Sequence, residues 1–265
     1  EGPMRLRTAL VKSKNLVAVR ILQAISPQYA QDYIARFGFD PKLHPPYLTM
    51  ALGAGNVTPL QMAAAYSIFA NGGHRIAPYF IERVEDARGN VLVTAQPAAA
   101  GSGAERVIDA RNAFIMSSIL RDVVRMGTGA RAMKLGRGDL AGKTGTTNEF
   151  VDAWFCGFNA ELAAVAWIGF DTPQTLGRNE TGAQAALPIW MGYMGPVLKG
   201  VAEQPLTPPG GIVAMNVNPD TGLRVAEGGL VDYFYHEFSP SAQETLVGGV
   251  TGSDRPREEV RNQLF

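Results

Sequence analysis

Cysteine, histidine and unbalanced charge are scarce in this chain of 265 residues. The single cysteine, Cys156, excludes an intrachain disulfide. The three histidines lie far apart without the spacing of metal ligands, so we expect no metal and no other cofactor. Lys plus Arg and Asp plus Glu number 24 each, and without a basic field nucleic acid is not an expected partner.

A long apolar run is also missing, so the sequence predicts no transmembrane segment and no signal peptide. The hydrophobic fraction of 46% is still ordinary for a globular protein that buries a sizeable core. The chain begins at Glu1 without an initiator methionine and enters a helical apolar pattern at once. We interpret this start as a cut inside a longer polypeptide, with any membrane anchor upstream.

Apolar spacing, capping residues and glycine stops predict the order of the elements. Helices are expected at residues 6–25 with a break at 13–15, then at 27–38, 59–71, 110–126 and 183–198. Strands are expected at 140–147, 152–158 and 162–170. The last two strands should pair antiparallel, and the apolar run in the third predicts burial on both faces. Hairpins are expected around 88–90 and within 211–225. Helices before and after an antiparallel sheet define an α+β fold.

Two short polar patterns stand out at the ends of these elements. Ser13-Lys14-Asn15 falls at the predicted helix break, and Lys143-Thr144-Gly145 falls on the first predicted strand. Lysine offers a point charge and threonine a short donor, whereas glycine leaves room for a ligand to approach. The second pattern therefore predicts a strand edge that holds an anion or an extended peptide.

A phosphate-binding P-loop is the competing interpretation of this lysine and threonine. That motif requires a glycine five residues before Gly142, where this sequence has Arg137. The lysine should also open a helix, whereas Thr146, Thr147 and the following aromatic run favour a strand. We therefore expect no nucleotide binding.

Longer stretches around the two patterns carry a family resemblance. The sequence contains "GKTGTTN", "DAWFCGF", "MGTGARA" and "LPIWMGYM" in this order. With the S-x-N and K-T-G patterns, these stretches resemble the transpeptidase domain of class A, bifunctional penicillin-binding proteins, which share their fold with serine β-lactamases. The resemblance implies an N-terminally incomplete transpeptidase domain at 1–204. Residues 205–265 would form a C-terminal extension with a small hairpin and a loosely ordered, charged tail.

The resemblance implies a peptidoglycan D,D-transpeptidase, which cross-links stem peptides through a serine acyl-enzyme. Ser13, Asn15 and Lys143 would be its catalytic residues in this chain. Ser13 would relay a proton to the leaving amine, Asn15 would bond the peptide backbone, and Lys143 would supply positive charge. We therefore expect Ser13 Oγ within about 2.7–3.5 Å of Lys143 Nζ.

The K-T-G strand would bind the substrate. Thr144 and Thr146 would bond its terminal carboxylate, and the Thr146 N–H would be one oxyanion donor. Gly145 would let the peptide lie against the strand as an added β-strand. No metal would take part.

The S-x-x-K motif that carries the family's nucleophile is missing. None of the serines has a lysine three residues later, and the nearest pattern is Ser118-Ile-Leu-Arg121. Arginine stays protonated and cannot act as the base. We interpret Arg121, together with Arg125 and Arg131, as part of a solvated helix face and loop. We expect the nucleophile upstream and this fragment to be inactive alone. A non-catalytic module that binds peptide or peptidoglycan is the alternative.

The resemblance also implies partners and a compartment. Stem peptides would be substrates and β-lactams inhibitors. The upstream part of the same polypeptide would supply the nucleophile segment, a glycosyltransferase domain and the membrane anchor. Such a protein would work at the periplasmic face of the bacterial inner membrane.

Overall fold

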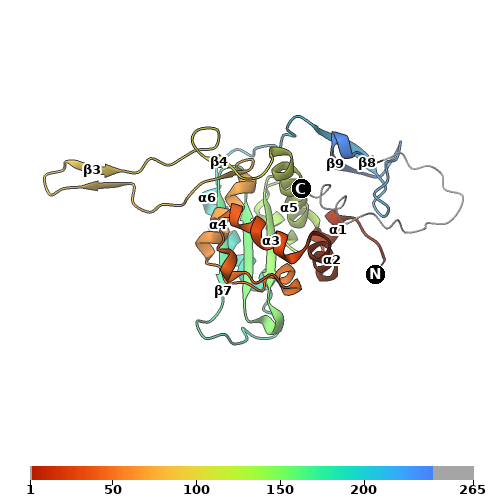
Figure 1. Ribbon diagram of the computed structural model, residues 1–265, viewed down its shortest axis with the longest axis horizontal. Coiled ribbons are helices and arrows are strands. Elements are labelled where there is room, and N and C mark those ends of the chain that lie inside the picture. Colours follow the sequence, from red (N-terminus) through yellow and green to blue (C-terminus); the bar gives the residue numbers. More distant parts are fainter. Residues whose placement is uncertain (1, 241–265) are drawn as a thin grey trace, which may run out of the picture.

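The computed structural model describes residues 2–240 and shows a three-stranded antiparallel sheet covered by helices on both faces (Figure 1). The predicted α+β fold is therefore confirmed. The helices are α1 Leu6–Val11, α2 Asn15–Ile25, α3 Pro27–Ile34, α4 Pro59–Ala70, α5 Ala110–Met126 and α6 Leu187–Val197. The central strands are β5 Ala141–Thr146, β6 Ala153–Phe158 and β7 Ala163–Ile168. Among the described residues, no helix is both long and apolar enough to cross a membrane.

Capping side chains fix where the helices begin. The Thr58 hydroxyl accepts from the Gln61 backbone, and the Gln61 side chain accepts from the Thr58 backbone, which forms a capping box before α4. Asp109 accepts from a backbone N–H of the first turn of α5. The break predicted between the first two helices lies at Lys12–Lys14. These contacts satisfy N–H groups that have no partner inside a helix.

The sheet has the order β5-β6-β7, so β5 lies at one edge. Residues three apart on β6 point to opposite faces. Phe155 packs against Trp190 of α6, with ring centroids 4.9 Å apart, and Phe158 packs against Tyr66 of α4 at 6.3 Å. Each face therefore has its own apolar layer, and the sheet is held rigidly between them.

Strand β7 differs from the sequence prediction. Its residues are mostly half-buried, and Trp167 is 38% exposed. The Trp167 indole lies over Trp154 of β6 and donates a hydrogen bond to Asp152. The prediction of burial on both faces was wrong because aromatic pairing on a partly open face gives the same apolar pattern.

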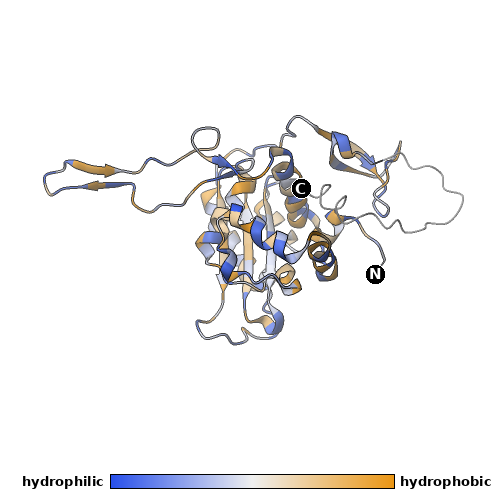
Figure 2. Cartoon of the chain, in the orientation of Figure 1, coloured by the Kyte–Doolittle hydropathy of each residue, from blue (hydrophilic) through white to orange (hydrophobic). Residues whose placement is uncertain are grey.

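A long hairpin extends from the body of the molecule on the side of α4 (Figure 1). Its strands are β2 Arg83–Glu85 and β3 Val91–Thr94, and the turn between them confirms the predicted hairpin. All their residues are exposed, although β3 is hydrophobic (Figure 2). Short strands β1 His74–Arg75 and β4 Glu105–Arg106 pair at the base of this hairpin.

The C-terminal hairpin pairs differently from the prediction. Strand β8, Ile212–Val217, pairs with β9, Leu230–Tyr235, and not with a strand inside residues 211–225. Only an isolated bridge joins Val217 to Arg224. The predicted loosely ordered tail lies outside the described residues, and the proposed boundary at 204/205 stays a prediction.

Buried ion pairs attach this hairpin to the start of the chain. Arg7 of α1 donates to Asp232 of β9 at 2.8 Å and to Asp122 of α5 at 2.7 Å. Arg5 donates to the other oxygen of Asp232 at 2.8 Å. Arg7 and Asp232 are both less than a tenth exposed. Loss of either partner would leave a buried charge, which typically costs about 3–5 kcal/mol.

Candidate active site

Ser13 lies in the tight connection between α1 and α2 and has a strained backbone. Its φ of 52° is in the left-handed region, which costs an L-residue about 1–2 kcal/mol. Two backbone hydrogen bonds hold this geometry, from Ser13 N to the Leu10 carbonyl and from Lys14 N to the Ala9 carbonyl. The connection is therefore fixed, and the exposed serine side chain is aimed by its backbone.

Lys143 approaches this serine from strand β5. Its Nζ donates to Ser13 Oγ at 2.8 Å and to the Thr144 carbonyl at 2.9 Å. The two side chains are 130 residues apart in sequence. The Nζ–Oγ distance lies in the range that we predicted, so the two motifs meet; the roles of the two residues stay predictions.

Burial shapes the protonation of this lysine. Its surroundings lower the Lys143 pKa from 10.5 to about 8, because an ammonium is poorly solvated there. Cys156 is paired with Lys143 on the neighbouring strand β6, and burial raises the pKa of its thiol to about 12. The cysteine is thus a neutral, buried neighbour, as expected for a strand residue that is not a nucleophile.

Thr144 makes a contact that the sequence analysis missed. Its Oγ1 lies 2.7 Å from Oγ1 of Thr128, in the loop after α5, and either hydroxyl can donate. The same loop reaches α1 through a 3.4 Å bond from Thr128 N to the Val11 carbonyl. Thr128 therefore connects the β5 motif to the helix that precedes Ser13. The signal in the sequence was a threonine between two glycines in "MGTGARA".

Thr146 and Gly145 have structural partners of their own. Thr146 Oγ1 accepts a 3.0 Å bond from Gly182 N, at the start of the π-helical turn Gly182–Ala186, so its hydroxyl hydrogen is left to donate elsewhere. A Cβ added at Gly145 would lie 3.1 Å from the Trp154 Cβ. Cross-strand crowding therefore gives one reason for glycine, besides the predicted approach of a peptide.

Among the predicted site residues, Asn15 has the fewest contacts with the others. It is the first residue of α2 and is exposed, and its side chain has no hydrogen bond to another described residue. The structure therefore brings together Ser13, Lys143, Thr144 and Thr128, with Asn15 two residues beyond the serine.

The arrangement combines a cation, hydroxyls and a free strand edge. Lys143 and Thr144 point to opposite faces of β5 because side chains alternate along a strand. Both side chains can contact the same ligand only at an edge of the sheet, where a ligand can reach both faces. Strand β5 is such an edge strand. Such an edge can hold a peptide backbone while the ammonium and hydroxyls bind an anion.

A family model described as the penicillin binding protein transpeptidase domain matches residues 1–186. The chain belongs to this family. The family resemblance predicted from the motifs is therefore confirmed. The matched residues include both the Ser13 connection and the Lys143 strand.

Individual relatives agree with this assignment. The chain is 40% identical to penicillin-binding protein 1A of Pseudomonas aeruginosa over 97% of its own length and 37% of the relative's. It is 49% identical to penicillin-binding protein 1A of Neisseria gonorrhoeae over 98% of its length and 34% of the relative's. It therefore spans roughly a third of the length of these curated relatives.

A solved structure supports the fold assignment. The crystal structure of penicillin-binding protein 1A from Haemophilus influenzae is 35% identical in sequence and superposes with a TM-score of 0.87. The match covers 92% of this chain and 42% of that chain.

Proposed function

We propose that this chain is the part of a peptidoglycan D,D-transpeptidase that binds the donor stem peptide and moves protons during acyl transfer. The single observation that carries the proposal is the 2.8 Å hydrogen bond from Lys143 to Ser13. It joins two of the family's motifs at the edge strand of the sheet. Membership of the penicillin-binding family supports both the substrate class and inhibition by β-lactams.

The reaction makes two demands on the site. A serine hydroxyl attacks the carbonyl between two D-alanines, and the terminal D-alanine leaves as an amine. An amine of a second stem peptide then takes the acyl group from the serine. Each step needs a proton to be moved and a developing oxyanion to be stabilised.

Ser13 and Lys143 answer the first demand. The Ser13 hydroxyl relays to the leaving amine the proton that the attacking serine releases, and the adjacent ammonium stabilises the partial negative charge on its oxygen during the transfer. Unit charges 4 Å apart interact by about 4 kcal/mol at an effective dielectric constant near 20. Asn15, close to Ser13 in sequence, hydrogen-bonds the backbone of the stem peptide with its amide.

Strand β5 answers the second demand and orients the substrate. The hydroxyls of Thr144 and Thr146 bind the terminal carboxylate, and the free hydrogen of Thr146 suits this role. The Thr146 N–H acts as one oxyanion donor, whose loss would typically cost about 3–4 kcal/mol. At Gly145 the peptide lies against the strand.

The nucleophile comes from outside this sequence. No serine in the chain is followed by lysine at the third position, and the matched region makes up only 37% and 34% of the two relatives. We place the S-x-x-K serine, a glycosyltransferase domain and a membrane anchor in other parts of the same polypeptide. The active protein then works at the periplasmic face of the inner membrane.

The missing serine–lysine pair favours one second candidate, a non-catalytic module that binds peptide or peptidoglycan. The two candidates make the same contacts to a peptide and differ only in acyl transfer. They are separated by labelling the full-length gene product with a fluorescent penicillin.

In that experiment we expect the full-length protein to be labelled and Lys143→Ala to slow labelling by at least about a hundredfold. Lys134→Ala is the matched control, because Lys134 is an exposed lysine that takes no part in the proposed site. Melting temperatures of all three proteins are measured in parallel. Equal losses of stability and labelling rate in Lys143→Ala would make the lysine merely structural, and a full-length protein that takes no label would favour the binding module.

A further inference from the structure

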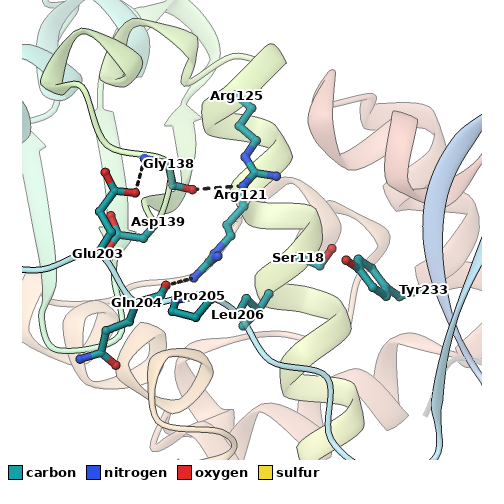
Figure 3. Close-up of a pocket in the computed structure, with 10 residues that line it drawn as sticks. All are labelled: Ser118, Arg121, Arg125, Gly138, Asp139, Glu203, Gln204, Pro205, Leu206 and Tyr233. Carbon is teal, nitrogen blue, oxygen red and sulfur yellow. Dashed lines mark hydrogen bonds between the residues drawn. The ribbon is translucent and has the colours of Figure 1, made fainter.

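A cavity of about 440 Å³ lies between α5 and the segment that leads into the C-terminal hairpin (Figure 3). Arg121 and Arg125, one turn apart on α5, line it from one side. Backbone and side chains of Gln204, Pro205 and Leu206 line another side. It shares no lining residue with the Ser13–Lys143 site.

Arg121 is a guanidinium without an acidic partner. It is half-buried, and its Nη2 donates only to the Gln204 carbonyl, at 3.2 Å. Among the described residues no carboxylate lies within ion-pair distance of it. Burial lowers the Arg121 pKa, and the positive charge of Arg125 lowers it further. The expectation of a simple solvated helix face was therefore wrong for this residue.

The carboxylates in the cavity wall are already occupied. Asp139 accepts two bonds from Arg137, at 2.9 and 2.7 Å. Glu203 accepts a 3.0 Å bond from a backbone N–H. Arg125 lies 3.9 Å from Asp122, so Arg121 is the arginine of the cavity wall that has no carboxylate partner among the described residues. A ligand with one carboxylate would pair with this single guanidinium.

The rest of the lining indicates an organic ligand. The Ser118 and Tyr233 hydroxyls point toward one another (Figure 3), and neither has a hydrogen-bond partner among the described residues. Pro205 and Leu206 add apolar surface. A cavity of this size lies within the range of small-molecule sites and exceeds what a bare ion fills.

We propose that this cavity binds a small organic monocarboxylate, held in a bidentate pair by Arg121, with Tyr233 or Ser118 donating to it and its apolar part against Leu206. Planar guanidinium groups match carboxylates in this way. A bound ligand would connect α5 to strand β9. The proposal is independent of the transpeptidase reaction.

Calorimetric titration of the 265-residue chain with benzoate tests the site, with benzamide as the neutral control of the same shape. We expect one saturable benzoate site per chain and no benzamide binding. Arg121→Gln should weaken benzoate binding at least about tenfold, because a charge-assisted bidentate pair is lost. Arg131→Gln removes an exposed arginine outside the cavity and should leave binding unchanged.

Tyr233→Phe keeps the test decisive if Arg121→Gln fails to fold. It preserves the ring that packs edge-on against Phe114, at 4.9 Å, and removes only the hydroxyl. Weaker benzoate binding in this variant supports the proposal. No benzoate binding by the wild-type chain, equal binding by Arg121→Gln, or inorganic phosphate binding as tightly as benzoate would each overturn it.

Discussion

Lys143 Nζ lies 2.8 Å from Ser13 Oγ, and the serine that accepts this bond has a left-handed backbone with φ 52°. The site therefore combines a partly buried cation with a strained residue. Both features destabilise the folded state. Substitutions that remove them should therefore stabilise the protein, whereas most mutations destabilise it.

The first prediction concerns the backbone strain at Ser13. Ser13→Ala and Ser13→Gly both remove the hydroxyl, but only glycine relieves the left-handed strain. We expect Ser13→Gly to be more stable than Ser13→Ala by about 0.5–1 kcal/mol, since the added freedom of the unfolded glycine offsets part of the relief. Urea unfolding monitored by circular dichroism measures the difference. If alanine is the more stable of the two, Ser13 is not strained in solution.

The second prediction concerns the protonation of Lys143. Its pKa is lower in the folded chain, about 8, than the 10.5 of an unfolded chain. Below pH 8 both states are protonated, so the full penalty for the buried charge is present. Between pH 8 and 10.5 the unfolded state binds more protons, and stability should rise with pH. This is the reverse of a lysine stabilised by a carboxylate.

Lys143→Met should therefore stabilise the chain by about 2 kcal/mol at pH 7, discounted for partial exposure, and this advantage should shrink toward pH 10. Lys134→Met, at an exposed lysine, should show neither effect. Free energies of unfolding at several pH values provide the measurement. A gain that is the same at pH 7 and pH 10 would contradict the lowered pKa.

The third prediction concerns the Thr128–Thr144 hydrogen bond. Thr128→Val keeps the shape of the side chain but leaves the Thr144 hydroxyl without its partner, at a cost of about 1 kcal/mol. In the full-length protein it should also slow penicillin acylation, because the Thr144 hydroxyl is no longer oriented. Thr128→Ser restores the hydroxyl and should restore the rate. Equal rates for the valine and serine variants would show that this bond does not position Thr144.

The fourth prediction concerns the chain by itself. Incubation with benzylpenicillin should give no covalent adduct, because no serine has a lysine three residues later to act as its base. Intact-mass spectrometry detects the addition directly. Stoichiometric acylation of any serine would show that a residue of this chain, Ser13 included, can act as the nucleophile.

Local signals in the sequence predicted much of this fold. The capping box at Thr58 and the proline that follows it fix α4, and the break at Lys12–Lys14 follows from residues that favour turns. The pairing of Ser13 with Lys143 could be predicted only from the family resemblance, since nothing in either tripeptide specifies contact over 130 residues.

The failures have a common physical cause, which is that tertiary contacts leave no local pattern. Strand β8 pairs with the more distant β9 although a nearer turn was available. Arg121 occupies an ordinary helical position, and only the returning segment at Gln204 buries it. Thr128 could have been identified as a candidate, because a threonine between glycines in a short loop can approach another strand closely.

The ion pair between Arg7 and Asp232 also bears on the order in which the molecule assembles. It closes a loop of 225 residues. Contacts of such sequence separation form late, because the entropy lost in closing the loop must be offset by other contacts that have already formed. Helix α1 is made well before β9 during synthesis, yet it can dock fully only after β9 exists. Because Ser13 follows α1 directly, we expect the Ser13–Lys143 contact to be among the last features to form. An incompletely synthesised chain would then fold its sheet without completing this contact.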